Sequence, residues 1–229
     1  MSLMGPAILI AHGLPGDALH DRAFELAGAR PLVAWIGAAN GDQRAWYERV
    51  ATVLRQRYGA EVQLARTVPS PGVALDPAET RRLVDAATMI YIGGGDVAVL
   101  AERVRALGLD EQVRRRHQEG ALVVGISAGA IGLTRYWVQF PEDNPELEQP
   151  TRFPCIGALD LAVDCHDEES EWEELRALLG AWEREEPGAR VDGYGIPLGG
   201  ALEVAPTGMV THLGPAPKWL RLDGGRVVE

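Results

Sequence analysis

Ser127 lies in the stretch LVVGISAGAIGL, residues 122–133, where it is the only residue with a hydroxyl group. An apolar, β-branched run precedes it, and Gly125 and Gly129 stand two residues to either side. This pattern is typical of a nucleophile elbow, a strained strand-to-helix turn at which bulkier flanking side chains would collide. The helix that follows would direct free backbone N–H groups at a developing oxyanion. The alternative is a buried strand that enters a helix through a glycine-rich loop, with Ser127 an ordinary hydrogen-bonded hydroxyl.

A serine nucleophile needs an imidazole that accepts its proton, and an acid that orients the imidazole. We predict His166 as this base, because it follows the apolar run 159–163 and would lie at the carboxyl end of a strand, as Ser127 does. His12 also follows an apolar run and is the rival. The remaining histidines lie in loop, helix and edge settings where a packed or solvated ring is expected: His20, His117 and His212.

Two carboxylates and a thiol are further candidates. Glu142 and Asp143 lie between nucleophile and base and give the chain order serine, acid, histidine, although a solvated acidic loop explains them equally well. Cys165 precedes His166 directly, but adjacent strand residues point to opposite faces, so we do not expect a cysteine–histidine pair.

The glycine run Gly93 to Gly95 follows an apolar segment and would let backbone N–H groups approach a substrate closely. Asp96 follows the run and would cap a helix. The run lacks the spacing of a Walker loop or a dinucleotide fingerprint, so no nucleotide or other cofactor is expected.

Alternating apolar strands and amphipathic helices must position these residues. Such alternation predicts an α/β fold with a mostly parallel sheet that helices cover on both faces. The expected strands are residues 7–11, 31–36, 62–65, 88–92 and 122–125, and the expected helices are residues 42–58, 76–87, 96–107 and 110–120.

The second half of the chain is less regular. Residues 134–154 lack a clear period and predict a long loop, residues 159–163 a strand, and residues 168–184 a helix. From residue 193 to the C-terminus, Gly and Pro turns between short alternating segments predict a small antiparallel edge. Because no linker separates these parts, residues 1–229 are expected to form a single domain.

Composition and charge limit the classes of molecule that the chain can bind. The net charge of −11 and the pI near 5.0 exclude nucleic acid and anionic membranes, which require a basic surface, and leave a short peptide or small molecule. The two cysteines have no metal-type Cys/His pairing, so free thiols and no metal are expected. No apolar run reaches the ~20 residues of a membrane span, which predicts a cytoplasmic protein. Trp172 and Trp182 serve either core packing or a homodimer contact.

Five segments in this order carry a family resemblance: YIGGGD, GALVVGISAGAIGL, LDLAVDCH, GYGIPLGGALEV and THLG. Together they resemble the dipeptidase E and cyanophycinase family of serine peptidases. The resemblance implies a class I glutamine amidotransferase-like fold, three-layered and flavodoxin-like, and hydrolysis of a short peptide or isopeptide.

By position, the resemblance implies that Ser127 is the nucleophile, His166 the base, and Glu142 the nearest match for the acid. The backbone N–H groups of Gly94 and Ala128 match the oxyanion hole. The residues implied to lie along the substrate are Gly93, Gly95, Asp96 and Glu171.

Three departures from the family pattern bear on specificity. Asp96 stands where asparagine is common, Leu198 stands where relatives often carry an acidic residue, and the acidic run 167–171 stands where members that favour acidic substrates carry arginines. Like charges would repel an aspartyl side chain, so we predict that neutral or cationic residues are preferred. Two alternatives stay open: a ligand-binding or regulatory protein that lost turnover, and an α/β-hydrolase esterase with His212 as its base.

Overall fold

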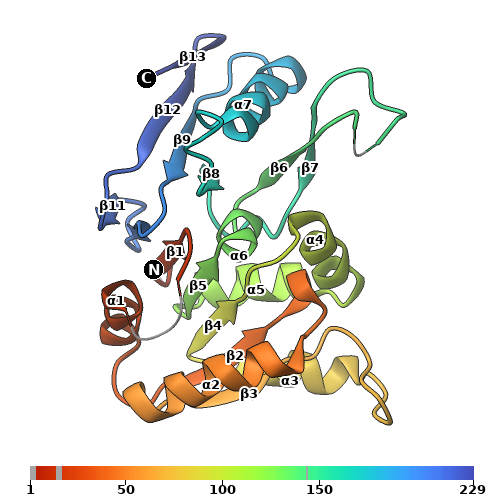
Figure 1. Ribbon diagram of the computed structural model, residues 1–229, viewed down its shortest axis with the longest axis vertical. Coiled ribbons are helices and arrows are strands. Elements are labelled where there is room, and N and C mark those ends of the chain that lie inside the picture. The colour runs from red at the N-terminus through yellow and green to blue at the C-terminus, as the bar shows by residue number, and fades with distance from the viewer. Residues whose placement is uncertain (1–3, 14–16, 143) are drawn as a thin grey trace.

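The computed structural model describes residues 4–13, 17–142 and 144–229, and its centre is a seven-stranded sheet (Figure 1). Its strand order is β11-β10-β1-β5-β4-β2-β3. Five neighbouring strands are parallel: β1 (Ala7–Ile10), β5 (Leu122–Ile126), β4 (Met89–Ile92), β2 (Leu32–Ile36) and β3 (Glu61–Leu64). Two antiparallel strands complete one edge: β10 (Ala201–Val204) and β11 (Val210–Leu213).

Helices cover both faces of this sheet, which confirms the predicted three-layer fold. Ile8 and Ile10 of β1 belong to an apolar core shared with α1 (Ala18–Ala27) and α2 (Arg44–Tyr58). Ala7 and Leu9 face the opposite core, as strand alternation requires. The helices that contribute to that second core are α3 (Pro77–Ala86), α4 (Val97–Ala106), α5 (Leu109–Gln118), α6 (Ala128–Gly132) and α7 (Glu173–Glu185).

A second sheet of four strands lies beside α7 (Figure 1). Its order is β13-β12-β9-β8, and its strands are β8 (Ala162–Cys165), β9 (Val191–Ile196), β12 (Lys218–Asp223) and β13 (Arg226–Val228). The strand before His166, β8, therefore does not extend the main sheet beside β5. The reason is that β5 already pairs with β1 on one side and β4 on the other.

The structure corrects three expectations for the elements. Residues 134–154 are not a continuous loop, because β6 (Tyr136–Gln139) and β7 (Thr151–Pro154) form an antiparallel pair. Helix α7 begins at Glu173 rather than near 168, because Glu171 and Trp172 have left-handed backbones. Helix α1 was not predicted; Asp17 caps it by accepting a hydrogen bond from the His20 amide.

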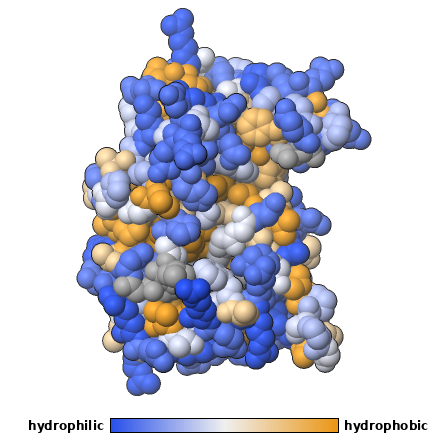
Figure 2. All heavy atoms as spheres, in the orientation of Figure 1, coloured by the Kyte–Doolittle hydropathy of each residue, from blue (hydrophilic) through white to orange (hydrophobic). Residues whose placement is uncertain are grey.

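The surface is largely hydrophilic in Figure 2, and it is hollowed beneath the β6–β7 hairpin. Within the described residues, no helix combines the length and the apolar character needed to cross a bilayer.

Candidate active site

Ser127 joins β5 to α6 with a backbone that only glycine adopts easily. Its φ is 50° and its ψ is −118°. The Ser127 amide donates to the carbonyl of Ile10, at 2.8 Å, and the Ser127 carbonyl accepts from the amides of Ala130 and Ile131. Backbone hydrogen bonds on both sides therefore hold the strained turn in place.

Two glycines make this turn sterically feasible. A Cβ atom on Gly125 would lie 2.5 Å from the carbonyl oxygen of Gly129, and one on Gly129 would lie 2.2 Å from the carbonyl oxygen of Ile92. Both contacts are far below van der Waals distance and involve backbone, which cannot rotate away. The glycines around Ser127 thus allow β4, β5 and α6 to pack closely against one another.

The structure brings His166 to Ser127. His166 Nε2 lies 2.8 Å from Ser127 Oγ, although the two residues come from different sheets. His166 follows β8 with a left-handed φ of 51°, and its amide donates to the carbonyl of Ile196 at 2.9 Å. The His12 ring meets the His166 ring edge-on, with centroids 6.4 Å apart. His166 therefore holds the position of a general base, with His12 next to it.

The structure does not bring Glu142 to this pair. Glu142 is exposed in the connection between β6 and β7, and Asp143 lies outside the described residues. Among the described residues, the only hydrogen-bond partner of the His166 ring is Ser127. Glu168, two residues after the histidine, accepts a hydrogen bond from the Leu198 amide at 2.5 Å.

The glycine run lies against the nucleophile. A Cβ atom on Gly94 would lie 3.4 Å from the Cβ of Ser127, so this backbone borders the reaction centre directly. Gly95 has a φ of 145°, and a Cβ there would lie 2.4 Å from the carbonyl oxygen of Ala39. Ala128 is the first residue of α6, so its N–H has no partner within the helix.

The other two residues implied to lie along the substrate, Asp96 and Glu171, make hydrogen bonds within the fold. The Asp96 carboxylate caps α4 by accepting from the Val99 amide at 2.8 Å, which explains an acid after the glycine run. Glu171 is exposed, and its backbone carbonyl accepts a hydrogen bond from Arg176.

A cavity of about 220 Å³ opens beside Ser127 and the glycine run. Aromatic rings form much of its wall: Trp35 and Tyr91 stack with centroids 4.7 Å apart, and Trp46 also lines the cavity. The Tyr91 hydroxyl lies 2.7 Å from His20 Nε2, and His20 Nδ1 lies 2.7 Å from Asp17 Oδ1. Burial lowers the pKa of His20 and so favours the neutral ring, which can donate from Nδ1 to Asp17 and accept from the Tyr91 hydroxyl at Nε2.

No local pattern in the sequence indicates this aromatic wall. Trp35 and Tyr91 lie in continuous apolar strands and have the pattern of ordinary core residues. His20 was assigned to a loop, whereas it is buried in α1. A buried histidine that is bonded at both ring nitrogens has no local sequence signal.

Both thiols are shielded. Cys165 Sγ lies 3.9 Å from the backbone carbonyl oxygen of Ser127, and burial raises the pKa of Cys165 well above its ordinary value. Burial raises the pKa of Cys155 to about 12. Neither cysteine can supply a thiolate at neutral pH.

Two further sequence-based alternatives concern a dimer contact through Trp172 and Trp182, and His212 as the base. The rings of Trp172 and Trp182 are 6% and 1% exposed and therefore pack in the core of this chain. His212 is exposed on β11, where its Nδ1 lies 3.3 Å from the carbonyl oxygen of Gly214.

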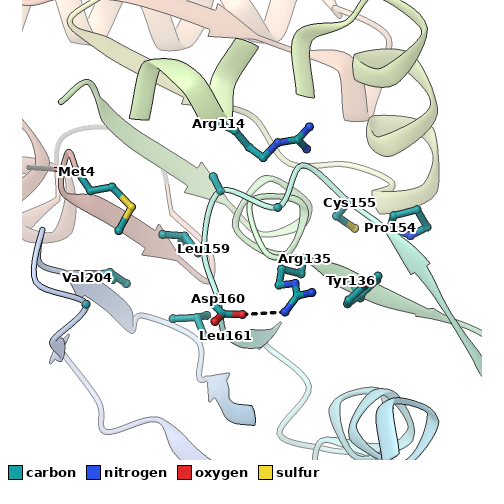
Figure 3. A pocket seen from close by; sticks show the side chains of 13 residues that line it. Met4, Arg114, Arg135, Tyr136, Pro154, Cys155, Leu159, Asp160, Leu161 and Val204 are labelled. Carbon is teal, nitrogen blue, oxygen red and sulfur yellow. Dashed lines mark hydrogen bonds and ion pairs between the residues drawn. The ribbon is translucent and has the colours of Figure 1, made fainter. Parts of the chain in front are cut away.

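A separate cavity has a volume of about 570 Å³. Figure 3 shows the residues that line it. Arg114 and Arg135 line it, but both are engaged: Arg114 donates to the Ile156 carbonyl, and Arg135 pairs with Asp160 at 3.2 Å. Its lining includes neither Ser127 nor His166. The chemistry therefore belongs to the smaller cavity.

Comparison with known proteins agrees with the geometry. The family model described as peptidase family S51 matches residues 17–208, which include both Ser127 and His166. Two curated relatives, each a pyridoxal 5'-phosphate synthase subunit PdxT from Thermus thermophilus, match part of the chain. One is 33% identical over 95 residues (40% of this chain, 44% of the relative), and the other is 30% identical over 96 residues (42% and 50%). The chain thus spans half or less of the length of these curated relatives.

Two solved structures share the fold. A peptidase from an acI-B1 Actinobacterium superposes with a TM-score of 0.72 at 21% identity, over 99% of this chain and 97% of the other. A putative peptidase E protein from Listeria monocytogenes EGD-e has a TM-score of 0.64 at 13% identity, over 93% of this chain and all of the other. At these identities the likeness concerns the fold.

Proposed function

The chain belongs to peptidase family S51, and from this premise we propose that it is a serine-type hydrolase of peptide or isopeptide bonds in short peptides. The observation that carries the proposal is the 2.8 Å separation between Ser127 Oγ and His166 Nε2 on a strained elbow. A hydroxyl presented in this way and bonded to an imidazole is the arrangement that acyl transfer requires.

In the proposed mechanism His166 takes the proton of Ser127 as its oxygen attacks the substrate carbonyl. The N–H groups of Gly94 and Ala128 stabilise the oxyanion of the tetrahedral intermediate. His166 then donates the proton to the leaving amine, which leaves an acyl-enzyme. Water then attacks this ester with His166 as the base. His166 returns the proton to Ser127 Oγ, the acid product is released, and free Ser127 is regenerated.

We do not extend the proposal to Glu142 as the acid of the triad. The family resemblance implies Glu142, but the described contacts of His166 include no carboxylate. A serine–histidine pair without an oriented acid would retain part of the rate, because the oxyanion hole and substrate binding contribute independently.

Specificity against acidic residues is the second part of the proposal. The acidic run begins at Asp167, directly after the base, and Glu168 is held on the Leu198 amide. A carboxylate on the substrate would be repelled there. Comparison of Asp-Leu, Leu-Leu and Lys-Leu dipeptides tests this: Asp-Leu should be hydrolysed most slowly, and fastest hydrolysis of Asp-Leu would contradict it.

Fluorophosphonate labelling tests the nucleophile. The wild-type chain should be modified at Ser127, and Ser127→Ala should abolish labelling and lower kcat by roughly 10⁴- to 10⁶-fold. His166→Ala should lower fluorophosphonate labelling and kcat by a similar order. His212→Ala, on exposed β11, should leave labelling and kcat unchanged. Loss of labelling in His212→Ala but not in His166→Ala would favour the α/β-hydrolase alternative.

A ligand-binding protein that lost turnover is the second candidate function. It is favoured by the acidic run 167–171, which departs from the family pattern directly after the base. An intact, folded wild-type chain that shows no labelling at Ser127 and no hydrolysis of any dipeptide would support it.

A further inference from the structure

The cavity beside Ser127 has walls that differ in character from the acidic segment after His166. Trp35, Tyr91 and Val50 form buried walls, Trp46 and Ile126 are partly buried, and Asn40 adds one amide. Resting on the proposed function, we infer that this cavity binds a large uncharged side chain, aromatic or long aliphatic, from the acyl half of the substrate.

The size of the cavity suits such a side chain. Its volume is about 220 Å³. An engineered apolar cavity of about 150 Å³ is already sufficient to bind benzene. A phenyl ring or a leucyl side chain therefore fits the space, whereas a methyl group would leave most of it unfilled and lose the corresponding apolar contact.

The lining disfavours charge of either sign. None of its described side chains is a carboxylate, an ammonium or a guanidinium. Its polar side chains are the His12 imidazole, the Asn40 amide and the hydroxyls of Ser127 and Tyr91, and the Tyr91 hydroxyl is engaged by His20 at 2.7 Å. A carboxylate or ammonium placed there would lose its hydration, and no carboxylate, ammonium or guanidinium of the described lining would compensate for that loss, which is costly.

Cation binding by the aromatic rings is also disfavoured. The guanidinium of Arg49 lies 5.9 Å from the centre of the Trp46 ring and carries the same charge as an incoming lysine or arginine. A second cation brought to the Trp46 ring would be repelled by this guanidinium. An uncharged occupant meets no such competition.

The position of the cavity assigns it to the acyl half. Ser127 and Gly94 line it, whereas His166 does not. His166 must reach the leaving amine to protonate it, so the leaving half extends toward the histidine. The other half, whose carbonyl carbon bonds to Ser127, is the half that extends over the glycine run into the cavity.

A series of p-nitroanilides with one leaving group and different acyl residues measures this preference. Phenylalanyl and leucyl substrates should have kcat/KM values at least tenfold above the alanyl substrate, because a few methylenes in an apolar pocket discriminate by about 10- to 200-fold. Aspartyl and lysyl substrates should fall at or below alanyl. An alanyl, aspartyl or lysyl substrate that equals phenylalanyl would overturn the inference.

Two variants test the cavity itself. Val50→Phe fills the space and should reverse the order of phenylalanyl and alanyl substrates. Because Val50 is 1% exposed and its replacement can impair folding, Trp46→Ala is the second variant. It removes part of the wall and should lower the phenylalanyl-to-alanyl ratio at least threefold. Trp219→Ala, which truncates an exposed tryptophan on β12, is the matched control and should leave the ratio unchanged.

The outcomes separate this inference from the proposed function. Labelling of Ser127 by diisopropyl fluorophosphate, together with hydrolysis that favours small or charged acyl residues, would overturn the inference and leave the function standing. A Trp46→Ala ratio equal to wild type would do the same. Absence of both labelling and hydrolysis in the folded wild-type chain would overturn the proposed function and the inference with it.

Discussion

Two left-handed backbones define the chemistry at the residue scale. Ser127 and His166, with φ values of 50° and 51°, are among six described non-glycine residues with positive φ. Each such conformation costs of order 1–3 kcal/mol and persists only where surrounding contacts impose it. Here backbone bonds to Ile10 and Ile196 impose it, and the result is an oxygen and a nitrogen 2.8 Å apart. The strained backbones are thus those of the two residues that would react.

The first prediction concerns the acid. Because Glu142 is exposed and its carboxylate is absent from the described hydrogen bonds of His166, we expect Glu142→Gln to lower kcat less than about threefold. Steady-state hydrolysis of one dipeptide by the variant and the wild type measures this. A loss near 10⁴-fold, the effect of removing an orienting acid in a serine protease, would show that Glu142 completes the triad after all.

At the scale of elements, the elbow depends on how closely β4, β5 and α6 approach one another. Gly129 lies against the Ile92 carbonyl, and the neighbouring Gly125 lies against the Gly129 carbonyl. The contacts are between backbones of different elements, so no rotamer change relieves them. The same close packing brings the Gly93–Gly95 backbone beside the nucleophile.

Gly129→Ala should therefore lower the free energy of unfolding by about 3 kcal/mol and remove fluorophosphonate labelling. Gly180→Ala is the matched control: Gly180 lies within α7, and its added Cβ would meet only the flexible end of Arg184 at 3.5 Å. That variant should be more stable than wild type by up to about 1 kcal/mol. Urea unfolding measures both, and a Gly129→Ala variant as stable as wild type would refute the steric account.

At the scale of the whole molecule, the site joins two sheets. Ser127 follows β5 of the seven-stranded sheet, and His166 follows β8 of the four-stranded sheet. The apolar core on one face of the large sheet continues into the second sheet and α7 without interruption. A shared core makes independent unfolding of either sheet costly.

We therefore propose that the chain is one cooperative domain. Far-ultraviolet circular dichroism and labelling of Ser127 should be lost at the same urea concentration, in a single transition. Loss of labelling at a clearly lower urea concentration, with most secondary structure retained, would mean that the second sheet detaches first and that the chain has two folding units.

The buried Asp164, on β8 of the second sheet, should make the stability of the folded chain depend on pH. It is 2% exposed, its Oδ1 accepts a hydrogen bond from the Cys165 amide, and burial raises its pKa to about 8. The pKa in the unfolded chain is near 3.8, so the folded state binds the proton more tightly. The stability that this proton contributes is complete below pH 4 and is lost as the pH rises through 8.

Asp164→Asn, which cannot ionise, should escape this loss. The Tm of Asp164→Asn minus the Tm of the wild type should be higher at pH 9 than at pH 5 by about 4 °C or more, corresponding to about 1–2 kcal/mol. Thermal unfolding at the two pH values measures the difference. An equal or smaller difference at pH 9 would show that Asp164 is already ionised in the folded chain at pH 5.

The sequence alone determined the features that depend on near neighbours. Continuous apolar runs predicted the five parallel strands, because a strand buried on both faces needs apolar residues at every position. The glycines around Ser127 predicted the elbow, because the collisions they avoid lie within a few residues or one strand away. The β6–β7 pair has no comparable local signal, because it depends on contacts between residues further apart in sequence, such as the packing of Arg152 on Tyr136, 4.4 Å from the ring centre.

Only the tertiary structure decided what surrounds the nucleophile. His166 reaches Ser127 from a second sheet that local patterns did not separate from the first. Tyr91 meets His20 across 71 residues of sequence, and Trp35 becomes a cavity wall only when it stacks on Tyr91. Local spacing encodes which face of an element is apolar. Which faces meet, and which atoms then come within bonding distance, follows from the packing of the whole chain.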